Sequence, residues 1–391
     1  MRLLAPLLVC LLALTLAGSA RAADPGIVGG QATSISAWPW QVALVDNGGG
    51  SALNRQFCGG SLIAPTIVLT AAHCVYNDGS NSFVSPGSLN VVTGRTNLSS
   101  SSGQEIHVSQ IHVLRNGSNQ VLYNPNTSAY DVELLQLAAP STSTPIKLAG
   151  ADEAALWSGG RTAFVTGWGA TNPSGETGYP DGLRMAQVRM YSDGECPNYL
   201  GNLFIPSVMV CAGAPPSRDT CNGDSGGPLV VPMLGGGYRL VGDTSFGLNE
   251  GCGVHPSAYG RVAGDPLRTL IRNKVLQVAG VDVVGAGGKP PSGGGGPTTL
   301  TAQQALDAAW SYSKSACVAD RLCRRYWAGQ CVVAGTAFNC QVRNYEKKRR
   351  RKATCRRNVS VSGSGAAPTV TPVGNWSCRR GWQRSAARRL G

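Results

Sequence analysis

Short β-like runs separated by turns dominate the chain from Ile27 to about residue 265. Examples are 41–45 (QVALV), 67–70 (IVLT) and 229–231 (LVV), and they alternate with stretches rich in Gly, Ser, Asn and Pro. Many short strands joined by turns are typical of an all-β sandwich or barrel. The pattern therefore predicts an all-β fold for this part of the chain.

A different pattern follows the β-like region. Between Asp265 and Val278, apolar residues recur at helical spacing and form one stripe, comprising Leu267, Leu270, Ile271, Val275 and Val278. This spacing predicts a helix with one buried face.

The chain changes character at 285–297 (GAGGKPPSGGGGP), which we interpret as a Gly/Pro linker. From Pro297 onward there are 18 Lys and Arg against 3 Asp and Glu, whereas the preceding residues carry 16 against 18. The sequence therefore predicts two bodies of opposite charge. The second is a basic six-cysteine module over 298–391.

Residues 1–22 have the features of a secretory signal peptide: Arg2, an apolar run from Leu3 to Leu16, and small residues before Ala22. Cleavage after Ala20 is nearly as well matched as cleavage after Ala22. No later stretch is apolar enough to span a bilayer, so we expect a secreted, extracellular protein. Twelve of the 13 cysteines remain after removal of Cys10, an even number suited to disulfide formation.

Residues 219–228 (DTCNGDSGGP) place Ser225 in a glycine-rich turn. A serine hydroxyl becomes a good nucleophile only beside a base. His73 in 70–74 (TAAHC) and Asp131 in 130–132 (YDV) offer the base and an acid that orients it.

These motifs resemble those of the trypsin-like serine proteases of the chymotrypsin fold. The resemblance begins at 27–30 (IVGG), continues through 57–61 (FCGGS) and 166–169 (TGWG), and covers about two-thirds of the chain. It implies two packed antiparallel β-barrels closed by a C-terminal helix, with a protease domain over 27–284. In the roles implied, Ser225 is the nucleophile, His73 the general base and Asp131 its orienting acid. The N–H groups of Gly223 and Ser225 would form the oxyanion hole.

The resemblance also implies a substrate pocket with Asp219 at its floor. A buried carboxylate there would select Arg or Lys from the substrate. One wall would be Ser245, Phe246 and Gly247, whose backbone can pair with substrate. The other wall carries Ser257, where trypsins usually have glycine, and its hydroxyl would either intrude on the pocket or bond to Asp219. Altered specificity for the residue before the cleaved bond (P1) is thus the alternative.

Activation would follow the family pattern, in which a freed N-terminus pairs with the aspartate before the serine. Ile27 and Asp224 match those roles, which makes residues 23–26 a short propeptide and the chain a zymogen. Residues 23–26 (ADPG), which end at the bond before Ile27, contain no basic residue. We therefore expect a non-tryptic activating protease or stepwise dipeptide removal.

The resemblance implies three disulfides in the protease domain: Cys58–Cys74, Cys196–Cys211 and Cys221–Cys252. We interpret His107 and His112 as surface or packing residues. His255 is either structural or borders the pocket, and Glu133 is expected to point outward from its strand. The sequence shows no metal-ligand pair on a helix and no acidic calcium cluster, so we expect no metal and no cofactor.

The basic module matches no family that we recognise. Residues 301–304 (TAQQ) resemble a capping box, and the six cysteines, which allow 15 connectivities, favour three disulfides over a zinc site. They are Cys317, Cys323, Cys331, Cys340, Cys355 and Cys378. The cations would bind an anionic polymer or envelope surface, assist secretion or folding, or form a solvated face.

The sequence thus predicts a secreted, monomeric serine endopeptidase that acts on protein or peptide substrates. Cleavage after Arg and Lys would also trim its own tail, including at Lys289. The alternative from another class is a catalytically silent protease homologue that acts as a binding protein.

Overall fold

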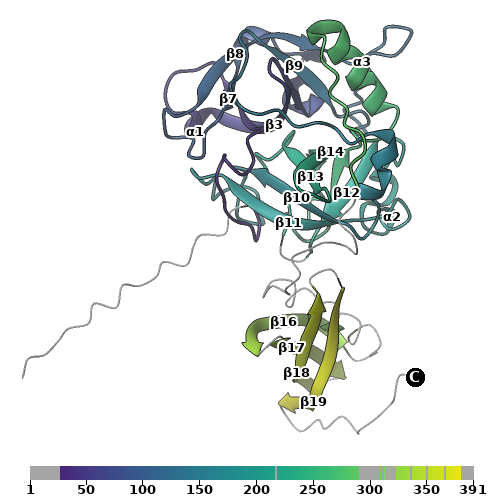
Figure 1. Ribbon diagram of the computed structural model, residues 1–391. Coiled ribbons are helices and arrows are strands. Elements are labelled where there is room, and N and C mark those ends of the chain that lie inside the picture. The colour runs from purple at the N-terminus through teal and green to yellow at the C-terminus, as the bar shows by residue number, and fades with distance from the viewer. Residues whose placement is uncertain are drawn as a thin grey trace, which may run out of the picture.

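The computed structural model describes residues 27–215 and 218–289, then Ala309, Tyr312, Ser313, Cys317 and four strand segments, 323–334, 337–348, 351–364 and 367–379. The predicted signal peptide, the propeptide and most of the linker lie outside these residues. In the part that the structure describes, two antiparallel β-barrels lie side by side, and a third, separate β-sheet follows (Figure 1). No helix of the described chain is long and apolar enough to cross a membrane.

Six strands close the first barrel in the order β2-β3-β4-β9-β8-β7. Their bounds are β2 Gln41–Asp46, β3 Gln56–Ala64, β4 Ile67–Thr70, β7 Leu89–Thr93, β8 Gln104–His112 and β9 Glu133–Leu137. Their aliphatic side chains fill the interior, with Leu44, Leu62 and Leu134 fully buried. The short strands β5 (Tyr76–Asn77) and β6 (Ser82–Phe83) pair with each other as a separate two-stranded sheet.

The second barrel closes because β11 pairs with both β10 and β12. Its strands are β10 Thr162–Gly167, β11 Arg184–Met190, β12 Met209–Gly213, β13 Pro228–Pro232, β14 Tyr238–Phe246 and β15 Ser257–Gly260, with β1 Gln31–Ala32 added at β11. Ile27, Val165 and Tyr259 belong to its core and are fully buried. The predicted all-β fold with two barrels is therefore confirmed.

The described helices are few. Helix α3 (Leu267–Ala279) follows the second barrel and buries Leu267, Ile271 and Val275, as the apolar stripe predicts. It ends at Gly280, whose φ of 67° is the left-handed conformation that favours glycine after a helix. The other short elements are α1 Ala52–Arg55, α2 Pro197–Leu200, and the 3₁₀ turns η1 Ala72–Cys74, η2 Pro86–Ser88, η3 Ala151–Leu156 and η4 Gly201–Leu203.

The described residues continue five positions into the predicted linker, to Lys289. Gly287 N–H donates to Asp152 at 2.8 Å, Gly288 N–H donates to Glu153 at 2.6 Å, and the Lys289 carbonyl accepts from Leu234. A Cβ on Gly288 would lie 2.4 Å from a Glu153 oxygen. Glycine at position 288 therefore permits the close approach of the backbone to Glu153.

The basic module contains an antiparallel sheet of β16 Cys323–Ala334, β17 Ala337–Lys348, β18 Arg351–Ser364 and β19 Ala367–Arg379. Its core includes Ala309, Val342 and Val359. Ala309 is helical, whereas the capping box predicted at 301–304 lies outside the described residues. One disulfide joins Cys317 to Cys323, and Cys340 and Cys355 are also disulfide-bonded.

Candidate active site

His73 and Asp131 come together because their strands are neighbours. β4 pairs with β9 in a register that places Thr70 opposite Glu133, so the turn after β4 lies against the residues before β9. The Asp131 carboxylate accepts from the His73 main-chain N–H at 2.9 Å and lies 2.8 Å from the ring Nδ1. Ser245 Oγ, at the end of β14 in the second barrel, donates to the same carboxylate at 2.5 Å.

The environment of this pair stabilises positive charge on the imidazole relative to a free histidine. The Asp131 side chain is 1% exposed and the His73 side chain 34%, so one side of the ring faces solvent. Burial lowers the pKa of His73, but the charge and hydrogen bond of Asp131, with a smaller contribution from Asp78, outweigh it and raise that pKa above 6.5. Because Nδ1 lies against Asp131, Nε2 is the ring nitrogen that remains to take a proton.

Ser225 is half-buried and lies beside the Cys58–Cys74 disulfide. Its carbonyl accepts from Gly59 N–H at 2.8 Å and lies 3.6 Å from Cys74 Sγ. The same sulfur is 3.8 Å from His73 Nε2. The disulfide thus contacts both the serine and the imidazole, which brings the two sequence-predicted residues to one place.

Two peptide groups beside Ser225 have fixed orientations. The Asn222 carbonyl accepts from Ala170 N–H, and the Asp224 carbonyl accepts from Gly227 N–H, both at 2.8 Å. In a trans peptide, C=O and N–H point in opposite directions. The N–H groups of Gly223 and Ser225 therefore point away from these partners, and neither donates to a described residue.

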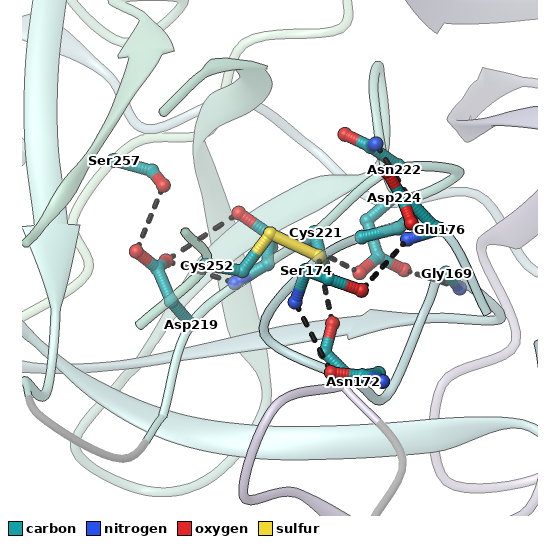
Figure 2. Close-up of a disulfide and its surroundings, with 12 residues drawn as sticks. Gly169, Asn172, Ser174, Glu176, Asp219, Cys221, Asn222, Asp224, Cys252 and Ser257 are labelled. Carbon is teal, nitrogen blue, oxygen red and sulfur yellow. Dashed lines mark hydrogen bonds between the residues drawn. A yellow bond between two sulfur atoms is a disulfide. The ribbon is translucent and has the colours of Figure 1, made fainter. Parts of the chain in front are cut away.

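Asp224 is buried beside this turn. Its carboxylate accepts from Gly169 N–H at 2.8 Å and from Cys221 N–H at 3.0 Å (Figure 2). A Cβ on Gly169 would lie 2.4 Å from that carboxyl group, which explains a glycine in the 166–169 motif. Burial raises the pKa of Asp224 to about 7, and no Lys, Arg or His of the described chain pairs with it. Ile27 is fully buried in the core of the same barrel.

Asp219 lies on the other side of the Cys221–Cys252 disulfide (Figure 2). It accepts short hydrogen bonds from Thr220 N–H and Ser257 Oγ, both at 2.8 Å, and longer ones from the Tyr259 and Thr220 hydroxyls. Burial raises the pKa of Asp219 to about 7, and these hydrogen bonds hold it below the value that burial alone would give. The sequence left open whether the Ser257 hydroxyl intrudes on the pocket or bonds to Asp219. In the structure it donates a hydrogen bond to Asp219.

The predicted walls lie near this carboxylate. β15 begins with Ser257, and β14 ends at Phe246 with Gly247 next. A Cβ on Gly247 would lie 3.2 Å from Ser257 Oγ, so the two walls approach each other closely.

The protease region has the three disulfides that the resemblance implies: Cys58–Cys74, Cys196–Cys211 and Cys221–Cys252. One cluster of potential metal ligands occurs among the described residues, namely Cys58, His73 and Cys74. It is not a metal site because its two sulfurs are bonded to each other.

The interpretation of Glu133 as outward-pointing is wrong. Glu133 is fully buried and accepts from Leu114 N–H at 3.1 Å. Alternation along a strand gives an exposed side only where one face meets solvent. β9 is covered on both faces, since Glu133, Leu134 and Leu135 are all fully buried. Burial raises the pKa of Glu133 well above its usual value.

The sequence reading also missed Asp243 on β14. It is fully buried, and neither carboxyl oxygen has a hydrogen-bond partner among the described atoms. Its carboxyl group occupies the side of Gly260 where a side chain would stand, and a Cβ there would be 2.3 Å from Asp243 Oδ1. Because β14 also carries Arg239, Thr244 and Ser245, its polarity pattern does not mark this acid as buried.

Together, the double barrel and this cluster of side chains define a chymotrypsin-like serine protease. The family model described as Trypsin matches residues 27–268. The chain is 39% identical to trypsin of Saccharopolyspora erythraea over 239 residues, which are 60% of this chain and 93% of that protein. It is 34% identical to trypsin-1 of Astacus astacus, over 61% of this chain and 95% of that protein.

A solved structure gives the same result. The chain superposes with a TM-score of 0.50 on neuropsin, a serine protease expressed in the limbic system of mouse brain. The sequence identity is 30%, and the match covers 63% of this chain and 98% of neuropsin. The chain belongs to the trypsin family and is a serine endopeptidase.

Proposed function

We propose that the protein is an exported endopeptidase that cleaves peptide bonds after Lys or Arg. The observation that carries the specificity is Asp219, a buried carboxylate that accepts hydrogen bonds but is paired with no cation among the described residues. A buried carboxylate of this kind is stabilised by a cation from the substrate. A neutral side chain would leave the charge unpaired and bind more weakly.

In the proposed mechanism, Ser225 Oγ attacks the scissile carbonyl while His73 Nε2 takes its proton. Asp131, which lies against Nδ1 and the main-chain N–H, holds the ring orientation and stabilises the imidazolium. The N–H groups of Gly223 and Ser225 receive the oxyanion. His73 then gives its proton to the leaving amine as the C–N bond breaks, and water hydrolyses the acyl-serine by the same route in reverse.

Activation in this proposal frees the amino group of Ile27 and pairs it with Asp224. Two observations support it: the buried carboxylate of Asp224 pairs with no cation among the described residues, and the side chain of Ile27 is buried. N-terminal sequencing of the active enzyme tests it: a chain that begins at Ile27 agrees, and an active chain that begins earlier contradicts it.

Hydrolysis of a peptide series that varies only at P1 tests the specificity. We expect the highest kcat/KM with Lys or Arg; higher values with Phe or Ala would overturn it in favour of altered P1 specificity at Ser257. A serine-directed fluorophosphonate should label the wild type but not Ser225→Ala. Absence of labelling and activity in the wild type would favour the catalytically silent binding protein.

We propose further that 27–284 forms a monomeric protease domain, joined through 285–297 to a module over 298–391 that binds an anionic polymer or envelope surface. The register of the β17–β18 hairpin supports this binding, since it places Lys347 opposite Lys352 and Lys348 opposite Arg351. Like charges directly opposite each other destabilise a sheet, and a polyanion would relieve the repulsion. A polyanion column tests the binding with Ser225→Ala, which cannot trim its own tail. Its retention should be salt-sensitive and should be lost when these four residues are replaced by serine.

A further inference from the structure

A glutamine from the first barrel reaches the serine-bearing loop of the second. Gln56, the first residue of β3, donates its side-chain N–H to the Gly223 carbonyl at 2.7 Å. The same amide nitrogen also donates to the Cys58 carbonyl at 3.1 Å. These two contacts fix the side-chain amide between β3 and the loop.

The residues before Gln56 anchor it. Arg55, the last residue of α1, is buried and donates to both carboxylate oxygens of Glu105 on β8, each at 2.9 Å. Arg55 also donates to the Asp46 carbonyl at 2.7 Å, and Asn90 donates to Glu105 at 2.7 Å. A bidentate Arg–carboxylate pair is geometrically restrictive. The backbone at Gln56 is thus held against β7 and β8.

The contact with Gly223 matters because of where that residue lies. Gly223 has a φ of 93°, and glycine can leave such a conformation easily because no Cβ restricts it. Its preceding peptide, which carries its N–H, is held by Ala170 of the second barrel. Its following peptide is held at the carbonyl by Gln56 and at the N–H by the Cys221 carbonyl.

We infer that Gln56 is a positioning residue for the oxyanion hole: it holds the backbone of Gly223 so that the N–H of that residue points at the reacting carbonyl. Gln56 need not touch the substrate for this role. The inference deepens the proposed mechanism, since it assumes that the Gly223 N–H receives the oxyanion.

Removal of a side-chain oxyanion donor lowers kcat by about 10²–10³. Loss of a residue that only positions a donor should cost less, because the Ala170 and Cys221 contacts remain. We expect kcat of Gln56→Met, which keeps the length of the side chain and removes its N–H donors, to fall about tenfold. KM should change less than twofold, because the contact is not part of the Asp219 pocket.

The experiment compares wild type, Gln56→Met, Gln56→Lys and the control Gln110→Met, an exposed glutamine on β8. Each is activated, quantified by complete fluorophosphonate labelling, and assayed for kcat, KM and inhibition by a peptide aldehyde and by benzamidine. The aldehyde forms an oxyanion at Ser225, whereas benzamidine occupies only the pocket. We expect Gln56→Met to lose affinity for the aldehyde in proportion to kcat and to keep its affinity for benzamidine.

Gln56→Lys supplies a donor of sufficient length and should restore most of kcat, whereas Gln110→Met should match the wild type. Unchanged kcat and aldehyde affinity in Gln56→Met would overturn the inference, and so would an equal loss of aldehyde and benzamidine affinity. Failure of the proposed function would give a different result: the wild type itself would neither react with the fluorophosphonate nor hydrolyse peptides.

Discussion

Replacement of Ser257 by glycine tests the electrostatics of the pocket. Ser257 Oγ provides one of the two 2.8 Å hydrogen bonds that Asp219 accepts. Burial raises the pKa of Asp219 to about 7, and the Ser257 hydroxyl opposes this effect. Since glycine removes the donor, the pKa of Asp219 should be higher in Ser257→Gly than in the wild type.

The size of the change follows from that one hydrogen bond. A hydrogen bond to a charged group contributes about 1.5–3 kcal/mol, and one pKa unit corresponds to about 1.4 kcal/mol. Complete loss would therefore raise the pKa of Asp219 by about 1–2. Water that enters the space replaces part of the interaction, so we expect an increase of about one.

The assay measures kcat/KM against pH for two peptides that differ only in P1, one with Lys and one with Leu. Both need neutral His73, but only the Lys peptide needs ionised Asp219. The acid limb of the Lys profile should therefore move up by about one pH unit in Ser257→Gly, while the Leu profile stays in place. If both profiles move together, or neither moves, Asp219 is not the group that binds the P1 cation.

Three further outcomes are expected. Burial raises the folded-state pKa of Asp243, so its carboxyl group destabilises the fold least below its unfolded pKa, and the destabilisation grows as pH rises toward the folded-state pKa. In a Ser225→Ala background, Asp243→Val should therefore raise the Tm, and more so at pH 8 than at pH 5. Removal of its two unpaired oxygens corresponds to about 1–3 kcal/mol, and a lower Tm at both pH values would contradict this. Active enzyme should trim its basic tail, so intact-mass analysis should find Gly391 in Ser225→Ala but not in the wild type; its retention in both would refute autolysis. Arg55→Met should lower kcat by roughly the same factor as Gln56→Met, because it releases the anchor of that residue; kcat equal to the wild type would show that β3 alone holds Gln56 in place.

The features that the sequence predicted well are those encoded locally or by a family motif. Alternation of short apolar runs with turns indicated the β fold, and the stripe through Ile271 indicated α3. The motifs around His73, Asp131 and Ser225 predicted a cluster that the structure builds at the junction of β4, β9 and the loop before β13. For Ser257 the sequence left two options open, and only the geometry of β15 beside Asp219 decides between them.

The features that escaped prediction depend on contacts between distant segments. Gln56 and Gly223 are 167 positions apart, and the sequence around neither residue predicts their hydrogen bond. Glu133 was misjudged because a strand covered on both faces has no solvent side, whatever its polarity pattern. Asp243 lies opposite Gly260 on the neighbouring strand, and its carboxyl group fills the space that a side chain at Gly260 would take. The periodicity of a single strand cannot reveal such a pairing.

The hydrogen bond from Ser245 of β14 to Asp131 before β9 has a mechanical consequence. It spans the two barrels, as the Gln56–Gly223 bond does in the opposite direction. A small slip of one half of the molecule against the other would break both links while each half kept its own strands and core. Peptide hydrolysis should therefore be lost at lower denaturant concentrations than those at which circular dichroism detects unfolding. Enzymatic turnover would then report on the relative position of the two barrels.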